Sequence, residues 1–314
     1  MTTMNVLVSG SSGYVGSRLI PRLVREGHVV RGLSRRPAPA HSPRTADPAA
    51  VTVVIGDAVS GAGLEAAFDG IEVAYFLIHS MEPSSDGEFQ TRERKAAENF
   101  ARAAQAAGVR RIVYLGGLVP AGGPASAHLA SRLQVEKILL QAAPCSVALR
   151  ASIIIGAKSR PFRFLVRLVE RLPVLAVPAW HVHRTTPIDE RDVVELLARA
   201  ATNEEVCGQS LDVGGSETVS YGELIDMIRE HLLLARPTIS FKRLTLTPIA
   251  SRISALITDE QYALIGPLMG SLEEDLLMRD NRAAEILRVH PHSLDAAIEH
   301  ALAEWETTEP LAAR

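Results

Sequence analysis

The chain has 314 residues, enough to bury a substantial core in one large domain or in two smaller ones. Its 33 basic and 36 acidic residues nearly balance, so no net basic field favours a nucleic-acid partner and no polybasic tail favours a membrane surface. Hydrophobic residues make up 47% of the chain and aromatic residues only 4%, which favours helices packed on a sheet over an all-β sandwich.

The first predicted elements are a β-strand, a glycine-rich turn and a helix. A short apolar strand runs into Gly10, Gly13 and Gly16, and a helix over 17–26 and a second apolar strand over 29–33 follow. In a dinucleotide-binding βαβ unit, the first glycine makes the tight turn, the second lets the backbone approach a pyrophosphate, and the third lets the helix pack on the strand. The pyrophosphate would lie at the helix N-terminus, where unpaired N–H groups and the helix dipole favour anions. The sequence therefore predicts a dinucleotide site.

The second strand ends in Ser34, Arg35 and Arg36, where the ribose of the adenosine half should lie. An NAD-selective site usually places an acidic residue there, whereas a 2′-phosphate favours arginine. Between residues 16 and 37 the only acid is Glu26, which lies at the far end of the predicted helix. We therefore predict NADP(H) in preference to NAD(H). The alternative is that the two arginines are simply solvated at the end of the strand.

Short apolar strands and amphipathic helices continue to alternate up to residue 155. We expect strands over 51–55, 73–78, 111–115 and 146–155, and helices over 64–68, 88–107 and 128–141. Parallel strands joined by right-handed helical crossovers form a doubly wound Rossmann sheet of the α/β class, with ligands at the carboxyl ends of the strands. Asp57 follows the third strand, where it either approaches the adenine edge or caps the helix that follows.

The pattern of elements changes after Gly156. We expect helices over 161–172, 191–201 and 221–234, strands over 210–213 and 238–246, and a mixed helical tail to Trp305. These elements predict a Rossmann domain over 1–155, to which 189–215 return, and a smaller, partly interleaved C-terminal substrate lobe over 156–188 and 216–314.

A stripe of arginines lies along one face of the predicted helix over 161–172. The stripe contains Arg160, Arg163, Arg167 and Arg171, opposite an apolar face. Such a stripe is most simply a solvated surface, and the alternative is a site for an anionic substrate or an acidic partner.

Over residues 4–215 the chain resembles a short-chain dehydrogenase/reductase of the extended or atypical kind, with NmrA-like NAD(P)H-binding proteins nearest. The resemblance rests on the glycine pattern of Gly10, Gly13 and Gly16, on the Arg35-Arg36 turn, and on the position of Asp57. It implies an oxidoreductase of the Rossmann fold that transfers hydride between NADP(H) and a small substrate. We expect an apolar carbonyl or enone substrate.

The chain departs from this family at the residues that carry its chemistry. Catalytic members have a Tyr-x-x-x-Lys motif after the fifth strand, and here the corresponding positions are His128 and Arg132. The family serine at the end of that strand is also missing, because Gly116 and Gly117 stand there. The alternative function is therefore a catalytically silent NAD(P)H-binding redox sensor.

The resemblance implies new roles for the residues at these positions. Arg132 would keep the ribose contact and the positive charge of the family lysine, because arginine stays protonated. His128, with an ordinary pKa near ~6.5, or a water that it orders, would donate the proton, although a neighbouring arginine favours neutral imidazole. His79 and Ser80 end the fourth strand and compete for the same role. For each candidate the alternative is a packing or loop residue without a proton role.

The residues expected to contact the cofactor come from the strand ends and from the family positions. They are Gly10, Ser11, Ser12, Gly13, Tyr14, Val15, Gly16, Ser34, Arg35, Arg36, Asp57, Ala58, Ile78, His79, Gly116, Arg132, Ala151 and Ser152.

The remaining expectations concern compartment and partners. Cys145 and Cys207 are far apart in sequence and lack a CxxC or metal-ligand spacing, so we expect core or surface thiols in a reducing cytoplasm. The segment His181-x-His183 lacks a nearby partner to complete a metal site, and we predict no metal. The start of the chain lacks the pattern of a signal peptide, which favours a cytoplasmic location. The family resemblance implies a homodimer through the helices over 88–107 and 128–141.

Overall fold

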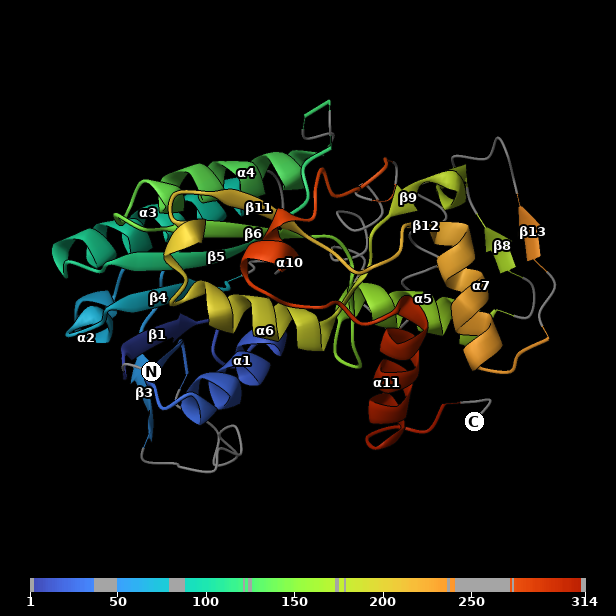
Figure 1. Cartoon of the computed structure of the whole chain (residues 1–314), viewed down its shortest axis with the longest axis horizontal. Coiled ribbons are helices and arrows are strands. Elements are labelled where there is room, and N and C mark those ends of the chain that lie inside the picture. Colours follow the sequence, from blue (N-terminus) through green and yellow to red (C-terminus); the bar gives the residue numbers. More distant parts are fainter. Residues whose placement is uncertain are drawn as a thin grey trace.

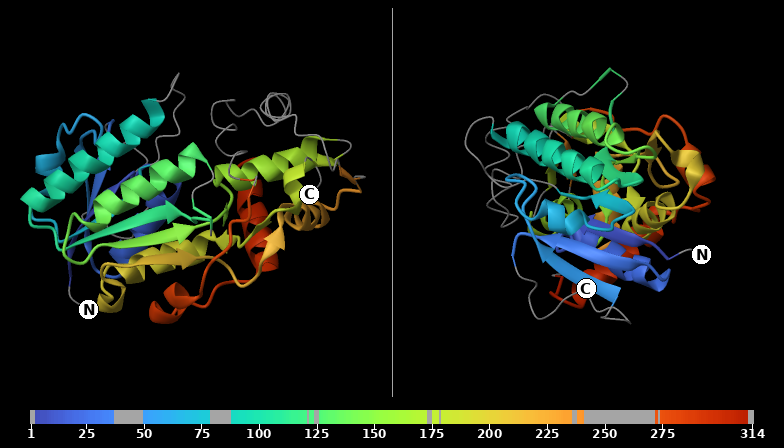
Figure 2. Two further views of the ribbon diagram at one scale, coloured as in Figure 1. Left: turned by 90° about the horizontal axis from the view of Figure 1, so that it is seen from above. Right: turned by 90° about the vertical axis from the view of Figure 1, so that its left-hand side faces the viewer.

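The structure is a computed structural model that describes residues 3–36, 50–78, 88–120, 122–123, 126–172, 175–177, 179–235, 238–240, 272 and 274–311. A larger lobe, built on a parallel sheet, lies beside a smaller lobe formed by later segments of the chain (Figure 1, Figure 2). The predicted α/β Rossmann class is confirmed.

Among the described residues, seven parallel strands form the main sheet in the order β11-β6-β5-β4-β1-β2-β3. Their bounds are β1 Asn5–Ser9, β2 Val29–Ser34, β3 Val51–Ile55, β4 Val73–Phe76, β5 Arg111–Gly117, β6 Val147–Ala151 and β11 Ser210–Val213. Strand β1 pairs with β2 on one side and with β4 on the other. The direction of the crossovers reverses at this point, and the loops at the carboxyl ends of β1 and β4 diverge and leave a crevice for a ligand.

Helices cover both faces of this sheet (Figure 1). On one face lie α1 (Tyr14–Arg25), α6 (Glu190–Ala200) and α10 (Arg282–Ile286), and their apolar side chains share one core cluster with β1, β5 and β6. On the other face lie α2 (Leu64–Phe68), α3 (Glu88–Ala106) and α4 (Ala127–Leu140), which form a second cluster. Most residues of the inner strands are buried on both faces, as expected for a parallel sheet covered by helices, whereas the edge strand β3 is largely exposed.

The predicted strand over 146–155 is two strands. The first, β6, ends at Ala151, and β7 (Ile154–Ile155) pairs with β10 (Ile188–Asp189) outside the main sheet. Between them the Ser152 hydroxyl donates a hydrogen bond to the Thr186 carbonyl, so the chain leaves the sheet there. The apolar residues of β7 continue the apolar run of β6, which explains why the sequence predicts one long strand.

The smaller lobe is built around α5 (Arg160–Arg171), α7 (Tyr221–His231) and α11 (Leu294–Glu306), which share a third apolar cluster. Short elements complete it: β8 (Leu175–Val177), η2 (Ala179–Val182), β9 (Arg184–Thr185), β12 (Val219–Ser220) and β13 (Thr238–Ser240). Strand β13 covers the start of the strand expected over 238–246, and residues 241–246 lie outside the described part. Helix α10, which we placed in the second lobe, packs on the Rossmann core instead, against β11. No helix in the described segments is both long and apolar enough to cross a bilayer.

The arginine stripe on α5 is not a solvated surface along its whole length. Arg163 and Arg167 place their guanidinium groups 4.3 and 4.9 Å from the centre of the Trp305 ring. Arg167 is buried and pairs with Glu170 and Glu309. These two arginines therefore fix α5 against α11, while Arg160 and Arg171, at the two ends of the stripe, are exposed.

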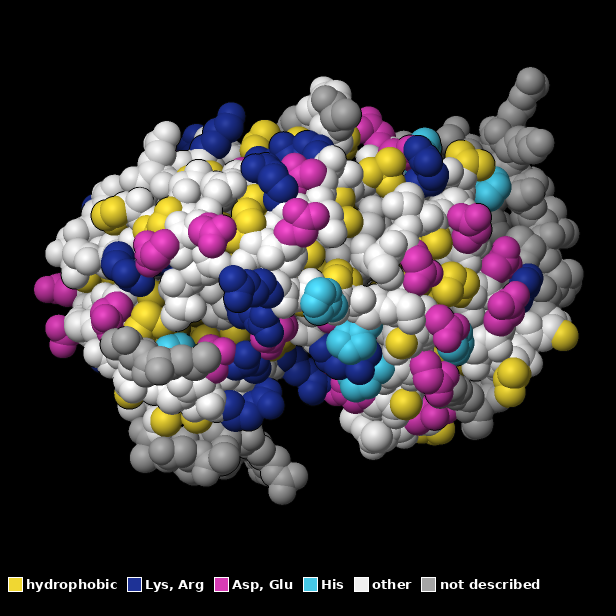
Figure 3. All heavy atoms as spheres, in the orientation of Figure 1, with side chains coloured by type: hydrophobic (Ala, Val, Ile, Leu, Met, Phe, Trp, Pro, Cys, Tyr) yellow, Lys and Arg dark blue, Asp and Glu magenta, His cyan; other side chains and the backbone are white. Residues whose placement is uncertain are grey.

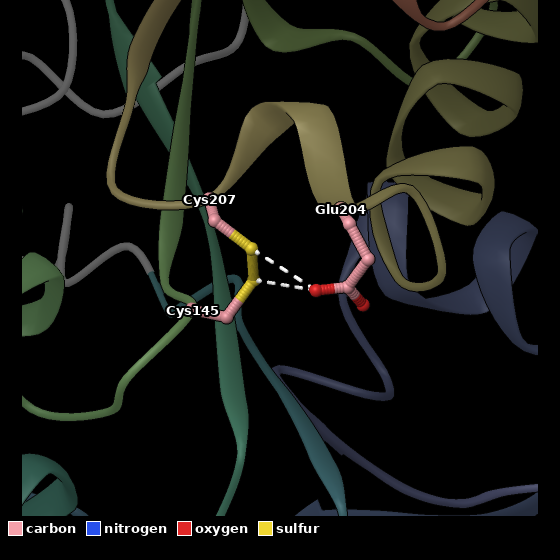
Figure 4. Close-up of side chains that lie close together, drawn as sticks. All are labelled: Cys145, Glu204 and Cys207. Carbon is pink, nitrogen blue, oxygen red and sulfur yellow. Dashed lines mark hydrogen bonds between the residues drawn. A yellow bond between two sulfur atoms is a disulfide. The ribbon is translucent and has the colours of Figure 1, made fainter.

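A disulfide joins Cys145 to Cys207, so the expectation of two free thiols is wrong (Figure 4). Cys145 precedes β6 and Cys207 follows the short helix η3 (Glu204–Val206), and the pairing of β6 with β11 brings these ends together. Glu204 lies against both sulfur atoms, but this cluster does not suit a metal because the fully buried Arg111 has Nη2 2.7 Å from the Cys145 sulfur. The disulfide also removes the cysteine-based argument for a reducing compartment.

Candidate functional site

The glycine-rich turn between β1 and α1 leaves no room for side chains. Gly10 has a φ of +70°, and a Cβ on it would lie 2.9 Å from the Leu77 carbonyl oxygen. A Cβ on Gly16 would lie 2.3 Å from the Gly10 carbonyl oxygen, and one on Gly13 would lie 3.0 Å from the same atom. The α1 N-cap residue, Gly13, provides no side-chain cap, so N–H groups of the first turn remain for a ligand. These features fit a dinucleotide pyrophosphate, as the sequence predicts.

A cavity of about 480 Å³ opens beside this turn at the carboxyl edge of the sheet. This volume lies within the usual range for small-molecule sites. It receives residues from the ends of β1 to β5 and from the start of α5. The cavity therefore connects the glycine turn to the smaller lobe.

Most of the predicted cofactor residues line this cavity. They are Gly10, Ser12, Gly13, Tyr14, Val15, Gly16, Ser34, Arg35, Asp57, Ala58, Ile78 and Ser152, together with the catalytic candidate His128. The predicted residues that do not line it are Ser11, Arg36, Gly116, Arg132 and Ala151. His79 and Ser80 lie outside the described residues. Ser11 has a structural contact instead, because its hydroxyl donates to the Leu33 carbonyl of β2.

The segments that follow β2 and β3 contribute two charged residues to the cavity lining, Arg35 and Asp57. Arg35 lines the cavity, whereas Arg36 is exposed and does not. Asp57 lines the cavity and also accepts a hydrogen bond from the Val59 N–H at 2.8 Å. Asp57 therefore lines the cavity and holds the local turn, but it does not cap the following helix α2, whose N-cap residue is Gly63.

Arg132 packs against β5 and does not line the main cavity. It is 6% exposed, and its Nη2 donates to the Leu115 carbonyl at 2.6 Å. Its guanidinium lies 5.6 Å from the centre of the Tyr114 ring, beside a small cavity of about 10 Å³ that Glu93 also lines. Glu93 accepts a hydrogen bond from Ser131, and burial raises the pKa of its carboxyl group. Arg132 does not line the main cavity, but its positive charge acts on His128, which does.

His128 does line the main cavity, and its Nδ1 is buried with no hydrogen-bond partner among the described residues. Burial first, and the charge of Arg132 second, lower the pKa of His128 to about 4. The sequence indicated the effect of the arginine, but the larger effect of burial depends on packing against α3, where Phe89 lies 5.7 Å from the imidazole. The lowered pKa favours a neutral imidazole over the imidazolium donor at neutral pH.

Tyr14 and Glu190 connect the cofactor turn to the smaller lobe. The Tyr14 hydroxyl donates to Glu190 at 2.5 Å, and Arg18 pairs with both Glu190 and Glu304. Gly156 lies against this pair, since a Cβ on it would be 1.9 Å from the Tyr14 hydroxyl oxygen. Helices α1, α6 and α11 are thereby held together beside the cavity.

Sequence reasoning missed some apolar cavity residues near strand ends, such as Leu77 and Leu115, and all of the cavity residues at the starts of α3 and α5. The latter are Arg92 on α3, and Lys158, Ser159, Arg160 and Pro161 at the start of α5. The signal available in the sequence was Gly156, which ends the sheet pattern and is followed within five residues by two basic side chains and Pro161. Proline in the first turn is typical of a helix N-terminus.

Comparisons with known proteins agree with this geometry. Residues 10–143 match a family model described as NAD(P)H-binding. A 3-beta-hydroxysteroid dehydrogenase of Mycolicibacterium neoaurum is 36% identical over 118 residues, which are 35% of this chain and 31% of that protein. A 3 beta-hydroxysteroid dehydrogenase/Delta 5-->4-isomerase of Mycobacterium tuberculosis is 35% identical over 136 residues, 38% of this chain and 35% of that protein. The match thus spans about a third of the length of these curated relatives.

Solved structures with the same fold cover nearly the whole chain. The crystal structure of UDP-glucuronic acid 4-epimerase from Bacillus cereus in complex with NAD has a TM-score of 0.74 and 16% identity, covering 97% of this chain and 99% of that one. At this identity the likeness establishes the fold alone. Together with the glycine turn, the match over residues 10–143 shows that this part of the chain is similar to NAD(P)H-binding proteins, and it supports the resemblance to the atypical short-chain dehydrogenases/reductases.

Proposed function

We propose that this protein is an NADP(H)-dependent oxidoreductase that acts on a small, largely apolar carbonyl or enone. The observation that carries the proposal is the cavity that joins the glycine turn to the start of the smaller lobe. Its apolar lining includes Leu77, Leu115 and Ile154, which would contact an apolar substrate. The names of the two curated relatives concern hydroxysteroids, which are apolar alcohols, and this supports the substrate class.

The residues of the chain would bind and orient rather than supply the reducing equivalents. Bound NADPH supplies the hydride in this class of enzyme. The first-turn N–H groups of α1 would hold the pyrophosphate, and Arg35 would hold the 2′-phosphate. His128, neutral and facing the cavity, would hydrogen-bond the substrate oxygen or a water that carries the proton.

The functional test is NADPH consumption by the purified protein with a panel of ketones, aldehydes and enones. We expect turnover with at least one apolar substrate. Replacing His128 with Ala should lower kcat about 100-fold or more, because a positioned proton-transfer group contributes about 10²- to 10⁴-fold, while the Kd for NADPH stays unchanged. Turnover that is insensitive to His128→Ala would refute the role of this histidine, not the cofactor site.

A specific observation favours a second candidate function, the redox sensor. The family's catalytic tyrosine and lysine are replaced here by His128 and Arg132. The lowered pKa of His128 disfavours proton donation, and Arg132 binds the Leu115 carbonyl instead of lining the described cavity. A protein of this kind would bind NADPH tightly and report the ratio of NADPH to NADP through a partner. Tight binding without turnover on any member of the panel would favour this candidate.

The choice of NADP(H) depends on Arg35. Replacing Arg35 with Ser should raise the Kd for NADPH by about 10- to 100-fold, since a charge-assisted hydrogen bond contributes about 1.5 to 3 kcal/mol. NADH binding should hardly change. Arg36→Ser is the matched control, because Arg36 is exposed and does not line the cavity, and it should change neither Kd appreciably. If the unmodified protein binds NADH as tightly as NADPH or more tightly, the proposed preference for NADP(H) is wrong.

A homodimer through α3 and α4 and a cytoplasmic location complete the proposal. Acidic and basic side chains are interspersed on the face shown in Figure 3, in keeping with a protein that has no nucleic-acid partner. The mass in solution, measured by light scattering, tests the dimer.

A further inference from the structure

A second place suited to an anion lies in the same cavity, at the start of α5. Lys158, Ser159 and Arg160 all line the cavity there. Helix α5 has 12 residues, and its N-cap residue Ser159 makes no side-chain cap hydrogen bond. The N–H groups of the first turn and the helix dipole therefore favour a negative charge at this end.

Ser159 itself indicates that this helix end is open to a ligand. Its side chain lines the cavity although the residue is only 2% exposed. Among the described residues its hydroxyl has no hydrogen-bond partner, whereas Ser126, Ser220 and Ser293 all cap their own helices. Its hydroxyl oxygen is not among the described polar atoms that are fully enclosed without a partner, so it remains open to the cavity and to a ligand group there.

The two charged residues beside Ser159 also favour an anionic ligand. Lys158 and Arg160 have no acidic partner in the described part of the chain, whereas Arg163 and Arg167 of the same stripe are paired with Glu309. The only carboxylate that lines the cavity within the described residues is Asp57, which comes from the loop after β3 at the adenosine end. The start of α5 therefore combines two cations, a hydroxyl and a helix N-terminus without a countercharge.

We propose that Lys158, Ser159 and Arg160, together with the first turn of α5, bind a carboxylate or phosphate group of the substrate. This inference deepens the proposed function: the preferred substrate would be an apolar carbonyl compound that carries one anionic group. The residues that form this site differ from those proposed to hold the anionic groups of the cofactor, which are the first turn of α1 and Arg35, although all of them line one cavity.

The first experiment measures binding of inorganic phosphate to the NADPH-saturated protein by calorimetry at constant ionic strength. The double variant Lys158→Gln/Arg160→Gln should bind phosphate about tenfold or more weakly, because two charge-assisted contacts are lost, while its Kd for NADPH changes less than about twofold. Ser159→Ala should weaken phosphate binding by a smaller factor. The matched control is Arg25→Gln/Lys137→Gln, which removes two exposed charges that do not line the cavity and should leave phosphate binding unchanged.

The second experiment identifies the anionic group through matched substrates. We compare kcat/KM for 2-hexanone, 5-oxohexanoate and 5-oxohexyl phosphate in the unmodified protein and in both double variants. A preference for one charged ketone over 2-hexanone, of about tenfold or more, should disappear in Lys158→Gln/Arg160→Gln and persist in Arg25→Gln/Lys137→Gln. The charged ketone that is preferred distinguishes a carboxylate from a phosphate.

Two results would overturn the inference. The first is phosphate binding that is equal in all variants. The second is NADPH binding that weakens together with phosphate binding, which would assign these residues to the cofactor. A protein that binds no NADPH at all would contradict the proposed function instead. In that case a tenfold loss of phosphate affinity in the cofactor-free double variant, against an unchanged control, would still support the anion site.

Discussion

Replacing Gly16 with Val should abolish measurable cofactor binding, with an increase in the Kd for NADPH of about 100-fold or more. The reason is steric: a Cβ at this position would lie 2.3 Å from the Gly10 carbonyl oxygen, a backbone atom that cannot move away without deforming the turn. Deforming the turn displaces the N–H groups that hold the pyrophosphate. Fluorescence titration with NADPH measures the effect.

The same substitution at Gly122 provides the control for Gly16→Val. A Cβ on Gly122 meets no atom within 4 Å, and its φ is not positive. Gly122→Val should therefore bind NADPH as the unmodified protein does. Circular dichroism on both variants separates loss of binding from loss of the fold, and a folded Gly16→Val protein that binds NADPH normally would refute the assigned role of the turn.

Stability should fall at acidic pH because His128 is held neutral in the folded protein. Its pKa is about 4 when folded, against an ordinary value of about 6.5 when unfolded. Between these values the unfolded chain binds the extra proton, so this contribution is fully present above pH 6.5 and is lost as the pH falls toward 4. The loss between pH 7 and 4.5 is roughly 2 kcal/mol, since one pKa unit corresponds to about 1.4 kcal/mol.

Urea unfolding at pH 7 and at pH 4.5 measures this contribution. The unmodified protein should lose roughly 2 kcal/mol more unfolding free energy than His128→Gln between the two pH values. His290→Gln replaces an exposed histidine and should behave like the unmodified protein. The same pH dependence in all three proteins would show that His128 titrates freely in the fold.

The sequence was sufficient to predict the sheet and the cofactor turn because both depend on local patterns. Gly10, Gly13 and Gly16 have a fixed spacing, and each parallel strand is a short apolar run that ends at a recognisable glycine or polar residue. The side chains that come directly from these strand ends, such as Ser34 and Asp57, consequently line the cavity as expected.

The features that the sequence did not predict depend on contacts between distant segments. The burial of His128, the inward turn of Arg132 and the disulfide between Cys145 and Cys207 all follow from packing between elements that no local pattern specifies. Arg160 and Arg167 belong to one stripe, yet one faces the cavity and the other is buried against Glu170. Which of them can meet a ligand is decided by α11, a helix more than a hundred residues away in the sequence.

Calorimetric titration of the folded protein with NADPH, NADP⁺ and NADH tests the central claim most directly. The account predicts saturable binding of NADPH at one site per chain, tighter than NADH. No detectable heat with any of these nucleotides at more than one temperature, from protein shown to be folded, would contradict it.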